Sequence, residues 1–167
     1  MQIIDNFLPS HQFKQLSDTM MGTYFPWFYS DGITEKHHSR RWQAFHMFYW
    51  DNEYPGNKVS SSQFFPIVEP LVNLLDITTL RRIKANMRMR TFLKDTSDYH
   101  LDYKDPAPGQ KTAVYYLTTN NGYTQFKNGK RVKSIANRIV IFDSTLFHRG
   151  VSCTDEKRRI VINFNWV

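Results

Sequence analysis

The feature that most constrains this chain is a series of short strand-like segments that starts near Leu80 and continues to Val167. The segments are RRIKANMRMRTFL, TAVYYLTT, TQFKNGKRVKSI, NRIVIFD and RRIVINFNWV. In the third segment, Asn128-Gly129 lies between two short runs and predicts a two-residue hairpin turn, because both residues tolerate positive φ. Short strands separated by turn signals predict an antiparallel sandwich or barrel with helices packed outside it.

The residues before Leu80 predict mainly helices and irregular structure. Apolar residues at helical spacing after Pro9-Ser10 predict a first helix that ends at Gly22. A second helix is expected over residues 60–75, with Pro66 near its start and Pro70 bending it. Two aromatic-rich segments, TYFPWFYSDG and RRWQAFHMFYW, are interpreted as strands or as loops packed on the core.

The length of 167 residues suits one domain with a sizeable core. We therefore expect a single domain over residues 1–167, with a helical or irregular part over about 1–79 and a β core over about 80–167. No stretch approaches the roughly 18 apolar residues of a membrane span, and the opening MQIIDNFLPS lacks the regions of a signal peptide. These features predict a soluble, cytoplasmic protein with no membrane partner.

The charge and the single cysteine limit the partners and the metal ligands. The chain has 22 Lys+Arg against 15 Asp+Glu, a net charge of +7, which favours an acidic or nucleic-acid partner. The basic residues are spread over short clusters, however, which is more typical of a solvated basic surface. Cys153 is the one cysteine, so no internal disulfide and no thiolate metal site can form. Any metal must therefore use His and carboxylate ligands.

Three residues form a candidate metal site. His100 and Asp102 are two positions apart, so on an extended strand both side chains leave from the same face. Alone, this pair is more often a surface histidine beside a solvated aspartate. His148 follows 46 positions later (148 − 102), just after NRIVIFD, at a distance that two hairpins could fold back onto His100. Two histidines and one carboxylate on one face of an iron leave positions open for substrate and oxygen.

A candidate anion site follows 11 residues after His148 (159 − 148), at Arg159 in RRIVIN. A guanidinium on such a strand faces inward only where it meets an anion, because an unpaired buried charge is very costly. The alternative is that Arg158 and Arg159 are both exposed at a strand end. We accept this alternative for Arg158 and expect Arg159 to face inward.

Taken together, HLD at His100 to Asp102, FHRG around His148 and RRIVIN from Arg158 resemble the motif of the non-haem iron(II)/2-oxoglutarate oxygenase superfamily, in its prolyl-4-hydroxylase-like branch. The resemblance covers about residues 80–167. It implies a double-stranded β-helix core, jelly-roll and cupin-like. The segments IIDNFLP, NNGYTQF, IANRIVIFDS and FHRGVSCTDEKRRIVINFNW are similar to small members carried by marine bacteriophages, in which the arginine directly before the apolar strand anchors the co-substrate. This favours Arg159 over Arg158.

The resemblance implies the roles of the site residues. His100, Asp102 and His148 would hold Fe(II), which 2-oxoglutarate chelates through its keto and C1-carboxylate oxygens, leaving one position for O2. Arg159 and Tyr116 would bind the far carboxylate, although a core aromatic is an equally good interpretation of Tyr116. Ascorbate is a possible reductant. Where the family often has Gly-Gly-Glu-Thr, this chain has Asn-Gly-Tyr-Thr, with Tyr123 in place of the acidic residue.

The function implied is a dioxygenase that hydroxylates an unactivated C–H bond and releases succinate and CO2. A prolyl residue of a peptide or protein is the first substrate expected, followed by an N-methylated base, as in a nucleic-acid demethylase; a free amino acid or other small metabolite is nearly as good. The host cytoplasm is the expected location if a phage encodes the chain. The hypothesis from another class is a non-enzymatic β-sandwich module that binds a protein or nucleic acid through its basic face.

The remaining candidates are assigned ordinary roles. Asp143 and Asp155 flank the segment around His148 and are either hydrogen-bond supports or turn residues. Cys153 is interpreted as structural. The other histidines lack a carboxylate at a useful spacing and are interpreted as surface or core residues: His11, His37, His38 and His46.

Overall fold

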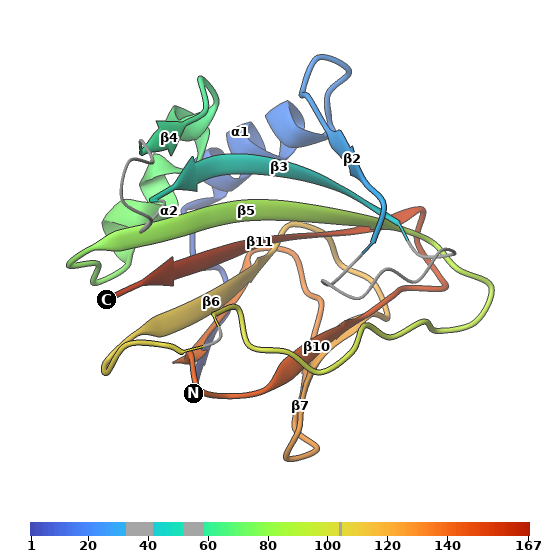
Figure 1. Ribbon diagram of the computed structural model, residues 1–167. Coiled ribbons are helices and arrows are strands. Elements are labelled where there is room, and N and C mark those ends of the chain that lie inside the picture. Colours follow the sequence, from blue (N-terminus) through green and yellow to red (C-terminus); the bar gives the residue numbers. More distant parts are fainter. Residues whose placement is uncertain (33–41, 52–58, 104) are drawn as a thin grey trace.

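The computed structural model describes residues 1–32, 42–51, 59–103 and 105–167. Two antiparallel sheets face each other, and two helices cover the outer face of the larger sheet (Figure 1). This confirms the prediction of a mainly β fold with flanking helices and a jelly-roll core. No helix in the described part of the chain is long and apolar enough to cross a membrane.

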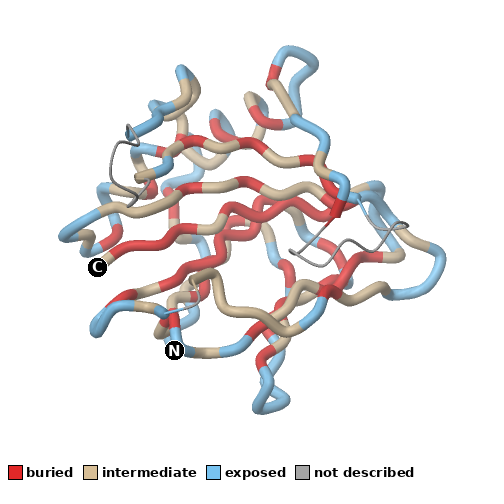
Figure 2. The backbone as a smooth tube through the Cα atoms, in the orientation of Figure 1, coloured by how far each residue is buried: buried red, intermediate tan, exposed pale blue. Residues whose placement is uncertain are grey.

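The larger sheet has eight strands and the smaller has three. Along the larger sheet the order is β1 (Gln2–Ile4), β9 (Arg138–Asp143), β6 (Lys111–Tyr116), β11 (Arg158–Trp166), β5 (Leu80–Met89), β3 (Gln43–Trp50) and β2 (Phe28–Ser30), with β4 (Ser60–Ser61) paired to β3. The smaller sheet has the order β10 (His148–Val151), β7 (Tyr123–Phe126) and β8 (Arg131–Lys133). Buried residues follow the central strands β6 and β11 (Figure 2).

The larger sheet is buried on both faces because its side chains alternate between two separate cores. On β11, Ile160, Ile162 and Phe164 belong to the core under the helices. Val161, one position out of phase with them, belongs to a second core between the sheets. Arg159 therefore shares the face of Val161 and points between the two sheets.

The first helix, α1 (Ser10–Met21), has the predicted limits and buries Leu16 and Met20 against the sheet. The prediction of one helix over residues 60–75 is wrong. The segment instead contains β4, a short 3₁₀ helix (Phe65–Ile67) and α2 (Glu69–Leu74), each of the two helices with a proline in its first turn. Pro66 and Pro70 lack an N–H and are tolerated at a helix start, so they begin two short helices rather than sit inside one long one.

The expectation of a helical or irregular part over about residues 1–79 is also wrong in one respect, since four strands lie there. β1 pairs with β9, and β3 pairs with β5, so this part of the chain extends the larger sheet at both ends. The aromatic segment QAFHMFYW is the strand β3, with alternating burial along most of its length. The strand alternative that the sequence left open for this segment is therefore the correct one.

The hairpin between β7 and β8 forms at the expected place but not with a two-residue turn. Phe126 N–H donates to the Lys130 carbonyl (2.9 Å), which leaves three residues in the loop, and Gly129 N–H donates to the Phe126 carbonyl (2.9 Å). Gly129 has φ +90°, whereas Asn128 is not among the residues with positive φ. The loop is therefore a turn followed by one left-handed glycine, which requires positive φ at one position only.

Asn137 fastens the N-terminal segment to the sheet. Its side chain accepts from Leu8 N–H (2.9 Å) and from the Tyr115 hydroxyl (2.8 Å), and it donates to the Leu8 carbonyl (2.8 Å). The residue is buried and has φ 61°, in the left-handed region that asparagine tolerates better than most residues. One side chain therefore satisfies three polar groups inside the protein.

Replacing Asn137 with alanine should lower the free energy of unfolding by about 2–4 kcal/mol, because three buried groups lose their partner together. Urea denaturation followed by tryptophan fluorescence measures this. Asn137→Gly adopts positive φ without strain and should be about 1 kcal/mol more stable than the alanine variant. A loss below about 0.5 kcal/mol, as at an ordinary surface position, would contradict this role.

Candidate metal and co-substrate site

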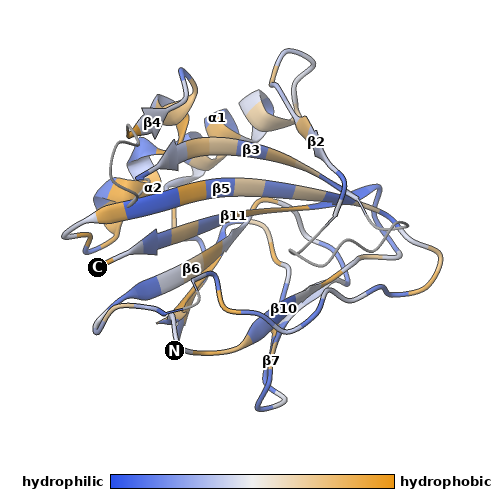
Figure 3. Ribbon diagram, in the orientation of Figure 1, coloured by the Kyte–Doolittle hydropathy of each residue, from blue (hydrophilic) through white to orange (hydrophobic). Residues whose placement is uncertain are grey.

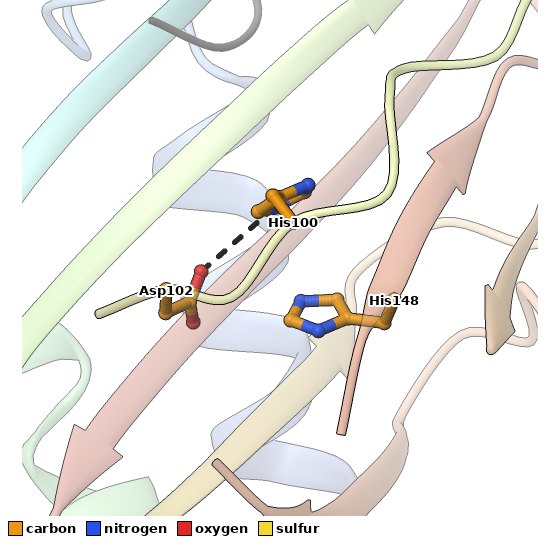
Figure 4. Close-up of side chains that lie close together, drawn as sticks. All are labelled: His100, Asp102 and His148. Atoms are coloured by element: carbon orange, nitrogen blue, oxygen red, sulfur yellow. Dashed lines mark ion pairs between the residues drawn. The ribbon is translucent and has the colours of Figure 1, made fainter. Parts of the chain in front are cut away.

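His100, Asp102 and His148 come together at one end of the space between the sheets. Their potential ligand atoms all lie within 4.8 Å of one another, and the side chains point into a common space (Figure 4). His100 Nε2 is 3.9 Å from Asp102 Oδ1. The structure thus brings together the three residues that the sequence proposed as metal ligands.

The sequence predicted one extended strand that carries both His100 and Asp102. The three side chains come together in another way. His100 and Asp102 lie in the loop between β5 and β6, while His148 begins β10. An isolated bridge joins the backbones of His100 and His148 through two hydrogen bonds, of 3.0 and 3.1 Å. This bridge places the two imidazole rings next to each other, with centroids 4.8 Å apart. The chain bends at Asp102, which brings the carboxylate close to both rings.

The hydrogen bonds of both imidazoles suit a metal. His100 Nδ1 lies 3.0 Å from the Asp98 carbonyl, and His148 Nδ1 lies 3.1 Å from the Leu146 carbonyl. A carbonyl can only accept, so each Nδ1 donates, and in the neutral ring Nε2 then keeps the lone pair that can bind a metal. This orientation of metal-binding histidines by backbone carbonyls is common in metalloproteins.

Asp102 is held as a carboxylate. Its Oδ1 is 3.1 Å from the Arg82 guanidinium, and its Oδ2 accepts a 2.8 Å hydrogen bond from Asn165. Burial alone would raise the pKa of Asp102, but the Arg82 charge and the Asn165 hydrogen bond hold the pKa well below its usual range.

His148 is held as a neutral imidazole, because burial lowers its pKa more strongly than the Asp102 charge raises it. A neutral imidazole with a free Nε2 beside an ionised carboxylate is the donor chemistry that a divalent iron requires. The residues present therefore fit such a metal.

A pocket of about 550 Å³ opens beside these three residues and extends along the inner face of the larger sheet. Arg159 lies in its wall with only 4% of its surface exposed. Its Nε donates to the Ser134 hydroxyl (2.9 Å) and one terminal nitrogen donates to the Thr124 hydroxyl (3.3 Å). Within the described part of the chain it has no carboxylate partner, and burial lowers its pKa to about 10. Such a guanidinium is a ready site for a carboxylate ligand.

Arg158 and Tyr116 are placed differently from Arg159. Arg158 is partly exposed at the start of β11 and does not line the pocket. Tyr116 is fully buried in the core between the sheets, with its ring centroid 5.6 Å from the Arg159 guanidinium carbon. Its hydroxyl donates to Thr124 (2.8 Å), the threonine that also contacts Arg159. Tyr116 thus touches the anion site through a shared partner.

Three supporting residues were missed from the sequence: Arg82, Thr124 and Asn165. Asn165 could have been found, because it lies on the same face of β11 as Arg159 by simple alternation. Arg82 was assigned to a solvated basic surface with the other basic clusters, but it lines the pocket, as Arg88 does. Thr124 has no sequence signal beyond its place after Tyr123, whose own ring contacts Lys94 and Arg131 instead of the pocket.

The other sequence candidates that the structure describes lie away from the pocket. His11 is exposed, whereas His46 is buried and its Nδ1 hydrogen bonds to the Pro26 carbonyl (2.8 Å). His37 and His38 lie outside the described residues. The turn role applies to Asp143, which accepts from Thr145, and Asp155 accepts from Asn121 N–H. Cys153 is buried.

The architecture is found in several solved structures. A 2OG-Fe(II) oxygenase family oxidoreductase from Burkholderia pseudomallei matches with a TM-score of 0.67 and 9% identity, over 98% of this chain and 83% of the other. A Trichoplax adhaerens prolyl hydroxylase, solved with a hypoxia inducible factor peptide fragment, matches with a TM-score of 0.66 and 17% identity over 99% and 82%. A Pseudomonas putida prolyl-4-hydroxylase matches with a TM-score of 0.64 and 16% identity over 99% and 91%.

This chain has the fold of the 2-oxoglutarate oxygenases. The resemblance predicted from the motif is thereby confirmed at the level of the fold. No protein-family model and no curated protein sequence matches the chain. Identities this low show the fold alone, and the roles of the site residues rest on their own geometry.

Replacing Asn165 with alanine should weaken metal binding about 10- to 100-fold, because Asp102 loses the amide that orients its carboxylate. Titration of the metal-free protein with Fe(II) under anaerobic conditions, or with Zn(II), measures the affinity. Asn73→Ala, at an exposed position on α2, is the matched control and should bind like the wild type. Equal affinities in the two variants would show that Asn165 does not support the ligand.

Proposed function

We propose that this protein is an Fe(II)- and 2-oxoglutarate-dependent dioxygenase that hydroxylates an unactivated C–H bond and releases succinate and CO2. The observation that carries the proposal is the presence, in one pocket, of the His100, Asp102 and His148 cluster and of the buried Arg159 without a carboxylate partner. A metal site alone would suit many reactions. The added anion site selects those in which a dicarboxylate binds beside the metal.

The residues divide the work of binding and positioning. His100, Asp102 and His148 would hold the iron, which together with 2-oxoglutarate and O2 supplies the oxidising chemistry. Arg159 would bind the far carboxylate, with Thr124 beside it. Tyr116 would act through Thr124, whose hydroxyl it already contacts. Arg82 and Asn165 keep Asp102 ionised and oriented before any ligand enters.

A prolyl residue of a peptide or protein is the substrate we propose first. The support is that two of the similar structures are prolyl hydroxylases and that one of them was solved with a peptide fragment. A nucleic-acid substrate has only the net charge of +7 in its favour, and two cations of the pocket, Arg88 and Arg159, are buried and do not form part of an open basic surface.

The test is an anaerobic titration of metal-free protein with Fe(II) and 2-oxoglutarate, followed by the visible charge-transfer absorption of the chelate. The wild type should develop the band, and His148→Ala should not. Absence of the band in a wild type that also binds no metal would reject the proposal and favour a non-enzymatic binding module.

Arg159→Ala should raise the 2-oxoglutarate concentration at half-maximal absorption by about 10- to 100-fold, because a charge-assisted contact to a carboxylate is lost. Arg158→Ala is the matched control, since it removes the same charge one residue away and should leave this concentration unchanged. The reverse result, with the effect at Arg158, would place the co-substrate elsewhere.

A further inference from the structure

The inner faces of β5 and β11 form a polar wall along the pocket, defined by four cross-strand pairs. The register places Arg82 opposite Asn165, Lys84 opposite Asn163, Asn86 opposite Val161, and Arg88 opposite Arg159. The first pair supports Asp102, and the last pair contains the proposed co-substrate anchor. Hydrophilic and hydrophobic segments alternate along β5 (Figure 3), since its other face packs under the helices through Ile83 and Ala85.

The cations of this wall differ in their partners. Arg82 is paired with Asp102 and Arg88 with Asp95. In the proposed function, Arg159 receives the far carboxylate of 2-oxoglutarate. Lys84 is then the cation that remains. Among the described residues its amino group has no carboxylate within 4.0 Å and no hydrogen-bond acceptor, and its nearest aromatic partner is the Phe45 ring, 4.9 Å away.

Lys84 is kept in the wall at a cost. Burial lowers its pKa, the neighbouring Arg82 charge lowers it further, and the Asp102 charge offsets part of this. Asp102 acts on it only from beyond ion-pair distance, and an ammonium that is partly removed from water is costly without a closer counter-charge. A lysine at this position is therefore best explained by an anion that enters the pocket.

Two unsatisfied acceptors lie beside Lys84. The Oδ1 atoms of Asn86 and Asn163 are buried and have no hydrogen-bond partner within the described chain. Asn163 is directly opposite Lys84, and Asn86 is the next residue on the same face of β5. Leaving such a buried atom unpaired is unfavourable, because it has given up its contact with water and gained no partner. One cation and two acceptors on a single face match a ligand with a carboxylate and N–H donors.

We propose that Lys84, Asn86 and Asn163 form a subsite for the primary substrate, and that this substrate carries a carboxylate together with N–H donors. A free α-amino acid and an acidic residue in a peptide share this chemistry. The proposal rests on the proposed function, because Lys84 is left for the substrate only if 2-oxoglutarate occupies the metal and Arg159. The pocket is also lined by Gln43 on β3 and Ser30 on β2, which lie beyond Lys84 along the larger sheet. The rest of the substrate has space there.

The experiment uses the full chain with Zn(II), which is redox-inert, and saturating 2-oxoglutarate, and it follows amide chemical shifts by NMR. The probes are the common free L-amino acids, their amides, and blocked peptides that contain either aspartate or asparagine next to proline. At least one carboxylate probe should give saturable shifts at Asn86 and Asn163, and its amide counterpart should bind about 10-fold more weakly or worse. Whether the free acid or the aspartate peptide binds identifies the source of the carboxylate.

Lys84→Met should weaken that binding about 10-fold or more and leave 2-oxoglutarate affinity within about twofold. Lys84→Arg should keep part of the binding, and Lys133→Met, at an exposed lysine of β8, should change nothing. Thermal unfolding of each variant shows that it is folded.

Three results would overturn the inference while leaving the proposed function intact. These are binding of no carboxylate probe below about 10 mM, equal binding of acids and amides, and a loss of 2-oxoglutarate affinity in Lys84→Met, which would assign Lys84 to the co-substrate. A wild type that binds no 2-oxoglutarate would instead reject both proposals.

Discussion

The side-chain alternation of β11 is the constraint on which both the core and the site depend. One face of this strand supplies Ile160, Ile162 and Phe164 to the core under the helices. The other supplies Arg159 and Asn163 to the pocket and Asn165 to the Asp102 carboxylate. Because the strand lies in the middle of the larger sheet, neither face can turn to solvent. A shift of one residue would bury the guanidinium under the helices and place isoleucines at the metal, so the core fixes the position of the site.

Without ligands, only part of the polar face of the larger sheet has partners for its polar and charged groups. Around Asp102 each polar group has a partner, since Arg82 and Thr112 both contact Asn165, and Asn165 contacts the carboxylate. Around Arg159, two hydroxyl groups accept hydrogen bonds from the guanidinium but do not balance its charge. The protein is thus organised before binding where a metal needs a fixed ligand set, and it is left electrostatically incomplete where an anion must be attracted. Along β5 and β11 the pocket therefore has one end that is pre-organised for a metal and another end that carries an unbalanced positive charge.

Much of this could be predicted from the sequence, for identifiable reasons. The phase of Arg159 against Arg158 follows from alternation in RRIVIN, and the helix from Ser10 follows from its apolar spacing. The positions of His100 and Asp102 were expected on a strand, and they lie instead in a loop that a two-hydrogen-bond bridge to His148 holds in place. No local pattern encodes a bridge between residues 48 positions apart (148 − 100). The basic residues of β5 were misjudged for a related reason, because their alternation with apolar residues looks the same whether the polar side meets water or a pocket.

The pairing of β1 with β9 has a consequence for how the chain is made. Ile3 lies opposite Val140, 137 positions later (140 − 3), and Asn137 binds Leu8 beside this pair. During translation at about 5–20 residues per second, the first strand must remain without its partner for roughly 7–27 seconds. The strand has only three residues, and Gln2 and Ile3 are exposed even in the finished protein, so the segment that waits is short. The pairing of β1 with β9 is therefore a late step in the life of the chain, and it completes one edge of the larger sheet only after most of the protein has been made.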